Sequence, residues 1–151
     1  MEQKDYILRE IEKIGILLKA ILNNLFGKKE NFATTLENQF EKTKELLINE
    51  INFDLDKFLY LNKSDSKDYL TKFKGINTEN LELLGEIIFQ FGINGQTDNK
   101  RLFFEKALQL YELCNAKDKT FSIERENRIK EIKSRKTEDG DQKQDSNYIV
   151  E

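Results

Sequence analysis

The apolar residues at the start of the chain recur at alternating spacings of four and three. A helical period of 3.6 residues places them on one face, with charged and polar residues on the other. From Asp5 to Phe26 this stripe contains Ile7, Ile11, Ile14, Leu18, Ile21 and Leu25. The pattern predicts a long amphipathic helix, and Gly27 stands where a glycine commonly ends one.

A second amphipathic helix is predicted to begin between Asn31 and Thr35 and to end near Ile51. Because the link between the two helices is short, we expect them to form an antiparallel hairpin. Apolar clusters at residues 53–61 and 69–73 then predict two brief helices. The polar residues between these clusters favour an interruption there.

Three further helices are predicted in the second half of the chain. The first is capped by Asn77 or Thr78, and the second covers residues 100–115. This second helix has apolar residues on two adjacent stripes, so we expect it to be the most buried element. The last, at residues 122–136, has few apolar positions and three oppositely charged pairs spaced four apart: Glu124–Arg128, Glu126–Lys130 and Glu131–Arg135. Such pairs favour a solvent-facing cover.

A spacing of large and small residues connects the first two of these helices. The first helix has a large residue, Leu-Gly three positions later and a large residue three after that; the second has an aromatic residue followed by Ala. The matching positions are Leu81, Leu84, Gly85, Ile88, Phe104 and Ala107. Residues 81–112 thereby resemble a tetratricopeptide repeat, which implies two closely nested helices. Lys100 and Glu112 depart from the repeat, where a small residue and a closing proline are usual, and no second copy aligns.

Three short segments extend the likeness to more of the chain. They are residues 5–12, 25–27 and 119–122. These segments resemble an uncharacterised family of small bacterial helical proteins, over most of residues 5–134. That resemblance implies an all-helical fold and supplies no activity.

Composition excludes several kinds of site. Among 151 residues there is no His and one Cys, Cys114, so the usual zinc sites and His-activated nucleophiles cannot be built. Cys114 falls on an apolar stripe, which favours a core thiol. A net charge of −3 makes nucleic acid an unlikely partner, and charges throughout the first helix argue against a membrane segment. A lone cysteine fits the cytoplasm.

These patterns predict an all-α protein in which an N-terminal helical hairpin packs on a tetratricopeptide-like helix pair with a polar capping helix. The expected domain covers residues 1–136, with the N-terminal helices at about 5–75 and the repeat-like unit and cap at 76–136. Residues 137–151 are polar and acidic, and they predict a disordered tail.

We expect a non-catalytic module that binds a protein or peptide, with no cofactor, metal or catalytic residue. The candidate groove residues are Asn80, Glu82, Glu86 and Gln90. Two other functions stay open: a small-ligand protein or enzyme using carboxylate, Lys or Tyr groups in a helical cavity, and an RNA-associated helical protein. The heptad-like spacing of the first helix also allows a homodimer through that helix.

Overall fold

The computed structural model describes residues 2–27, 32–95, 99–119 and 122–150, and within them the side chains of 4–25, 38–95, 99–119 and 122–136. All the regular structure in these ranges is helical, which confirms the predicted all-α class. The helices are α1 (Glu2–Gly27), α2 (Phe32–Ile51), α3 (Leu55–Tyr60), α4 (Lys63–Thr71), α5 (Thr78–Asn94), α6 (Lys100–Lys117) and α7 (Ile123–Val150).

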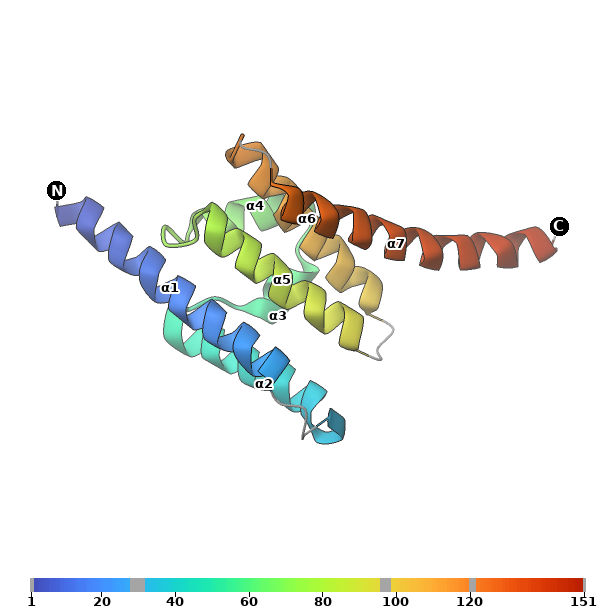
Figure 1. Cartoon of the computed structure of the whole chain (residues 1–151), viewed down its shortest axis with the longest axis horizontal. Helices are drawn as coiled ribbons and strands as arrows, with labels where there is room; N and C mark the ends of the chain where they lie inside the picture. Colours follow the sequence, from blue (N-terminus) through green and yellow to red (C-terminus); the bar gives the residue numbers. More distant parts are fainter. Residues whose placement is uncertain (1, 28–31, 96–98, 120–121, 151) are drawn as a thin grey trace.

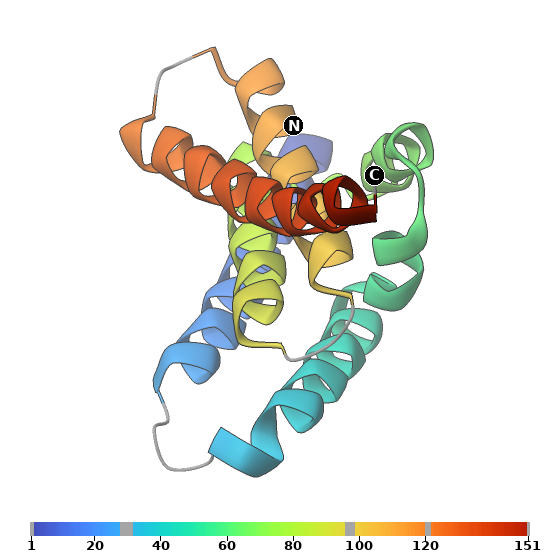
Figure 2. The same ribbon diagram turned by 90° about the vertical axis from the view of Figure 1, so that its right-hand side faces the viewer.

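Helix α5 lies at the centre of the fold. It runs antiparallel to α6 and packs closely along it, while α1 packs against another side of α5 (Figures 1 and 2). Nine residues of α5 are buried, against seven of α6. The prediction that residues 100–115 form the most buried helix is therefore wrong, because α1 and α6 cover α5 from two sides, whereas polar residues of α6 such as Arg101, Glu105 and Glu112 stay exposed.

The apolar stripe of α1 packs into the core as predicted. Ile14, Leu18 and Ile21 are each at most 2% exposed. Helix α2 returns antiparallel to α1, but the two helices diverge in the perpendicular view (Figure 2). Their mutual contact is slight, and the main partner of α1 is α5. The first two helices thus splay apart instead of packing along their length.

Short polar side chains set several helix ends. Asn52 follows α2 with φ of 59°, the left-handed conformation that Asn tolerates better than most residues. Asp54, Asn62 and Asn77 precede α3, α4 and α5, and each accepts a hydrogen bond from a backbone N–H three residues later. The cap at Asn62 lets α4 start at Lys63, so the polar run that the sequence favours as an interruption is mostly helical.

Aromatic residues in and beside α3 and α4 join these two helices. The rings of Phe53, Tyr69 and Phe73 meet with centroids 5.1–5.3 Å apart. The Tyr69 hydroxyl also accepts a hydrogen bond of 2.8 Å from the backbone N–H of Asp54. Aromatic burial and this polar contact hold the two short helices together as one unit. Neither helix is long enough to be stable alone.

The contact between α5 and α6 depends on small residues. A Cβ atom at Gly85 would lie 3.2 Å from the ring of Tyr111 and 3.5 Å from Cβ of Leu110. Ala107, on the facing helix, is fully buried. Both small residues lie at the helix contact, where the sequence spacing had placed them.

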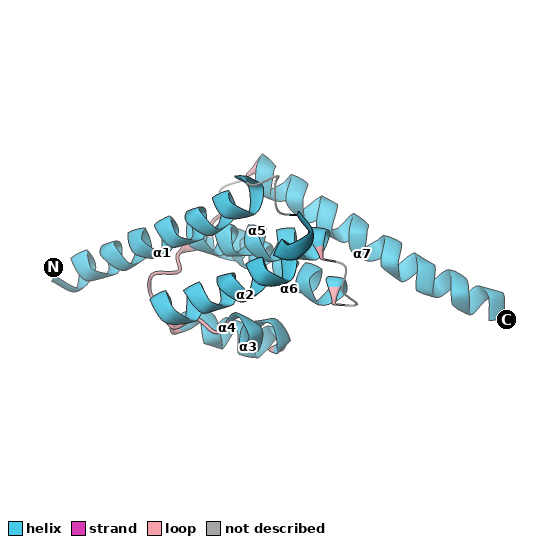
Figure 3. Ribbon diagram, turned by 90° about the horizontal axis from the view of Figure 1, so that it is seen from below, coloured by secondary structure: helices cyan, strands magenta, loops and turns pink. Residues whose placement is uncertain are grey.

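Helix α7 crosses α6 and buries Ile129 and Ile132 against the body. It continues to Val150, well past the Lys136 end that the sequence predicts, and projects from the body opposite to the start of α1 (Figure 3). Side chains after Lys136 lie outside the described residues. A disordered tail over 137–151 stays a prediction.

Candidate binding groove

A groove of about 910 Å³ lies over α5, between α1 and α7. Helix α1 lines one side with Ile11, Glu12, Gly15, Ile16 and Lys19, and α7 lines the other with Glu124, Arg125, Asn127, Arg128 and Glu131. The remaining lining residues are Glu79, Asn80, Glu82, Leu83 and Glu86 of α5 and Tyr111 of α6. We refer to this set as the α1/α5/α7 groove. Its walls come from segments that are far apart in the sequence.

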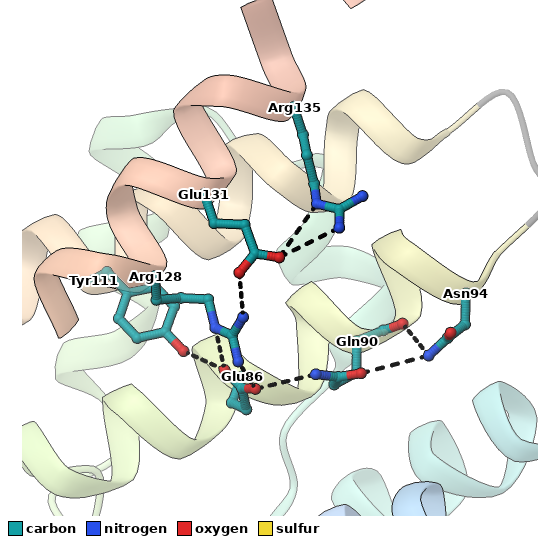
Figure 4. A network of polar contacts seen from close by, with 7 residues as sticks. All are labelled: Glu86, Gln90, Asn94, Tyr111, Arg128, Glu131 and Arg135. Carbon is teal, nitrogen blue, oxygen red and sulfur yellow. Dashed lines mark hydrogen bonds and ion pairs between the residues drawn. The ribbon is translucent and has the colours of Figure 1, made fainter. Parts of the chain in front are cut away.

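Glu86 is the centre of a polar network on the α7 side of the groove (Figure 4). Its carboxylate accepts a hydrogen bond of 2.7 Å from the Tyr111 hydroxyl and bonds of 2.9 and 2.5 Å from the Arg128 guanidinium. Burial, reinforced by the nearby Glu86 charge, raises the pKa of Tyr111, so its phenol stays protonated as a donor. The same Arg128 also bonds Glu131 at 2.9 Å. This network fixes α7 to α5 and α6.

Arg125 forms a second link, one helical turn earlier in α7. Its side chain is only 4% exposed, and its Nε donates to Glu82 at 2.8 Å. The other end of the guanidinium bonds the side-chain oxygen of Asn115 at 3.1 Å and lies 3.6 Å from Asp118. A buried guanidinium needs such partners because desolvation without them is costly. Arg125 therefore ties α7 to both helices of the central pair.

Three of the four predicted groove residues line the observed groove: Asn80, Glu82 and Glu86. Two of them hold α7 in place through their arginine partners. Asn80 is 3% exposed, and its amide donates to the backbone oxygens of Ile11 and Gly75, so it joins α1 to the start of α5. Gln90 lies outside the groove lining and donates to Glu86 at 3.1 Å.

The walls from α1 and α7 were absent from the sequence-based set. Ile16 carries the clearest signal, because it is a large apolar residue off the core stripe of its helix, and it is 63% exposed. Leu8 lies two turns earlier on the same side of α1 and is 53% exposed. Apolar side chains left exposed beside a groove indicate a surface that can be covered.

The arginines in the described part of α7 are held by carboxylates. Arg125 and Arg128 bind Glu82 and Glu86, and Arg135 binds Glu131 at 3.3 Å. Of the three predicted intrahelical pairs, only Glu131–Arg135 forms within the described part of α7. Arg128 instead reaches across to α5, so α7 is an anchored helix and not only a solvated cover.

Groups with potential chemistry elsewhere are also committed to the fold. Cys114 is fully buried, as predicted, and burial raises the pKa of its thiol to about 12. A thiol with that pKa is a poor nucleophile near neutral pH. Within residues 4–25, 38–95, 99–119 and 122–136, no group of three or more Cys, Asp or Glu side chains could hold a metal ion.

A smaller pocket of about 260 Å³ lies between α3, α4 and α6 and is bordered by Lys106. This side chain is 4% exposed, and its ammonium group donates to Leu61 O, Ser66 Oγ and Gln109 Oε1. It also lies 5.0 Å from the ring centroid of Phe58. Three acceptors satisfy all three N–H donors, so Lys106 fastens α6 to the α3–α4 turn.

Comparison with known proteins supplies no relative for this groove. No protein-family model, curated protein or solved structure matches the chain. Among the described helices, none has the length and apolar character required to cross a membrane.

Proposed function

We propose that this protein is a non-catalytic interaction module that binds a segment of another protein in the α1/α5/α7 groove. One observation carries this proposal: a groove of about 910 Å³ leaves Ile16 63% exposed beside Glu12 and Lys19, which are also exposed and form no ion pair within the described ranges. An exposed apolar anchor within a polar rim is typical of protein interaction surfaces. The tetratricopeptide-like spacing of α5 and α6 supports the same function, since stacked helix pairs present such surfaces.

The alternative of an enzyme or small-ligand protein has less support. The central carboxylates of the groove, Glu82 and Glu86, are bound by arginines, and the Tyr111 hydroxyl donates to Glu86. A general acid or base must reach a substrate proton. These groups instead satisfy one another, which favours a structural role for them.

The homodimer through α1 also has less support than binding to another protein. The heptad-like stripe on which it depends is buried inside the chain at Ile14, Leu18 and Ile21. The exposed residues of α1 lie on other sides of the helix. Pairing between copies stays a prediction that this packing does not favour.

Site-specific photo-crosslinking in the host tests the proposal. A photoreactive amino acid at position 16 lies in the groove, whereas the same group at position 60 replaces Tyr60, which is 68% exposed on α3 and outside the groove lining. We expect one discrete protein adduct from position 16 and none of that mass from position 60. Equal adducts from both positions, or none from position 16, would contradict the proposal.

A further inference from the structure

The charge of the α1/α5/α7 groove restricts the chemistry of its partner. Six carboxylates and three cationic groups line it. Two of the cations, Arg125 and Arg128, are bound by Glu82 and Glu86. The balance among the remaining groups is therefore what an incoming segment encounters.

Three carboxylates at the rim are uncommitted. Glu12 of α1, Glu79 of α5 and Glu124 of α7 are exposed, and within the described ranges none of them takes part in an ion pair or side-chain hydrogen bond. Lys19 is the corresponding uncommitted cation of the lining. The three carboxylates come from all three helices that surround the groove, one from each.

The apolar part of the groove lies inside this rim. Ile11, Ile16 and Leu83 provide it. Gly15, between the two isoleucines in sequence, lies against Asn80, where a Cβ atom would be 3.2 Å from the side-chain oxygen. Figure 1 shows α5 passing between α1 and α7, so a segment lying over α5 would meet apolar groups below and carboxylates on either side. A partner that matches this arrangement has one apolar face and cationic flanks.

The backbone of the groove favours a helical partner. Strand addition requires an exposed sheet edge, and the described residues form helices. Recognition of proline-rich segments uses an aromatic-lined groove, whereas the aromatic residue of this lining, Tyr111, is 3% exposed. A helix that presents apolar anchors at i, i+3, i+4 and i+7 to a groove between helices is the mode that fits this lining.

Resting on the proposed function, we infer that the α1/α5/α7 groove binds a basic amphipathic helix of a partner protein. Its apolar face lies on Ile16 and Leu83, and Lys or Arg residues along its flanks pair with Glu12, Glu79 and Glu124. Exposed pairs of this kind add little affinity each, but they steer association and reject acidic segments. An RNA or an anionic lipid surface would meet the same carboxylates as repulsion.

A displayed library of amphipathic helices tests this inference on the full chain. Each helix has about 18 residues, five turns at 3.6 residues each, with a fixed apolar face and Lys, Gln or Glu at random on its polar flanks. Selected peptides are then measured by fluorescence anisotropy against two triple variants. E12Q/E79Q/E124Q neutralises the rim, and E45Q/E50Q/E112Q makes the same charge change at exposed sites outside the groove lining.

The inference predicts enrichment of Lys at the flanks. It also predicts a dissociation constant raised about tenfold by E12Q/E79Q/E124Q at low salt and nearly unchanged by the control triple. If the enriched peptides carry Gln or Glu, and Ile16→Ser abolishes their binding, the inference of a basic partner is overturned while the groove remains a binding site. If both triple variants weaken the binding of Lys-rich peptides equally, the attraction is diffuse, and the inference of pairing at the groove is also overturned. Absence of any enrichment sensitive to Ile16→Ser would overturn both the inference and the proposed function.

Discussion

The guanidinium carbon of Arg128 lies 4.2 Å from the ring centroid of Phe89, a fully buried residue of α5. The same guanidinium bonds Glu86 on one side and Glu131 on the other. One side chain therefore combines stacking on an aromatic face with two carboxylate contacts, a combination that suits Arg better than Lys. Through it, the polar helix α7 is fixed to the centre of the fold.

Replacing Arg128 by Lys tests this link while keeping the charge. An ammonium group cannot bond Glu86 through two nitrogens and stack on Phe89 at the same time, so we expect a loss of about 1–2 kcal/mol in the free energy of unfolding. Urea denaturation followed by circular dichroism measures it. Arg101→Lys is the matched control, because Arg101 makes only an exposed pair with Glu105. Equal losses in the two variants would contradict the role of Arg128.

Glu82→Gln removes the charged partner of the buried Arg125. The carboxylate of Asp118, 3.6 Å from the Arg125 guanidinium, then remains to balance its charge. We expect the free energy of unfolding to fall by about 1–3 kcal/mol. Glu79→Gln, one turn earlier on the same helix, should change it by less than about 0.5 kcal/mol, because Glu79 is exposed. The pair can be measured by urea denaturation under identical conditions. A neutral Glu82→Gln would show that Arg125 does not depend on this contact.

Lys106 should give the stability of the protein a pH dependence that Lys106→Met lacks. Burial lowers the pKa of Lys106 from its usual value of 10.5. Between the lowered pKa and 10.5, the unfolded chain binds a proton that the folded chain has released, so the free energy of unfolding rises with pH in that window. The free energy of unfolding of wild type minus that of Lys106→Met should therefore rise as the pH approaches 10.5.

Denaturant titrations at several pH values measure this difference. The control is Lys67→Met, because Lys67 is exposed on α4. Its difference from wild type should stay flat over the same range. A flat difference for Lys106→Met, or one that falls with pH, would contradict a lowered pKa at Lys106.

Gly75→Ala should destabilise the contact between α1 and the turn before α5. A Cβ atom at Gly75 would lie 2.6 Å from Cδ1 of Ile14 and 2.9 Å from backbone atoms of Glu10. Because a helix backbone cannot move aside alone, we expect a cost of about 1–3 kcal/mol, seen as a lower Tm. The neighbouring Lys74→Ala, at an exposed site, should leave Tm nearly unchanged. An unchanged Tm for Gly75→Ala would show that α1 can shift without loss.

Local patterns predict much of this fold. The stripe from Ile7 to Leu25 identifies the core side of α1, because helical periodicity alone sets which residues share a face. Gly85 and Ala107 mark the α5–α6 contact for a similar reason, since close helix approach excludes bulk. Asn77 caps α5 and is one of the two capping residues that the sequence predicts.

Contacts between residues far apart in the sequence could not be predicted from those local patterns. Arg128 has Glu131 and Glu124 within helical reach, yet it reaches Glu86, 42 residues away in the chain. Only the packing of α7 on α6 brings these two residues together. For the same reason Glu82 and Glu86 could be placed near a groove from the sequence, whereas the walls from α1 and α7 could not. Ile16, a large apolar residue outside the core stripe of α1, was the one sequence feature that indicated the α1 wall.

Chemical-shift mapping by NMR locates the bound segment on the protein. Isotope-labelled full chain is titrated with the partner segment that crosslinks at position 16, and the backbone amides that shift are located on the structure. Binding in the α1/α5/α7 groove predicts shifts concentrated at Gly15, Ile16, Leu83 and Asn127, which lie on three sides of that groove. Shifts confined to α3 and α4, or spread evenly over the surface, would contradict binding in this groove.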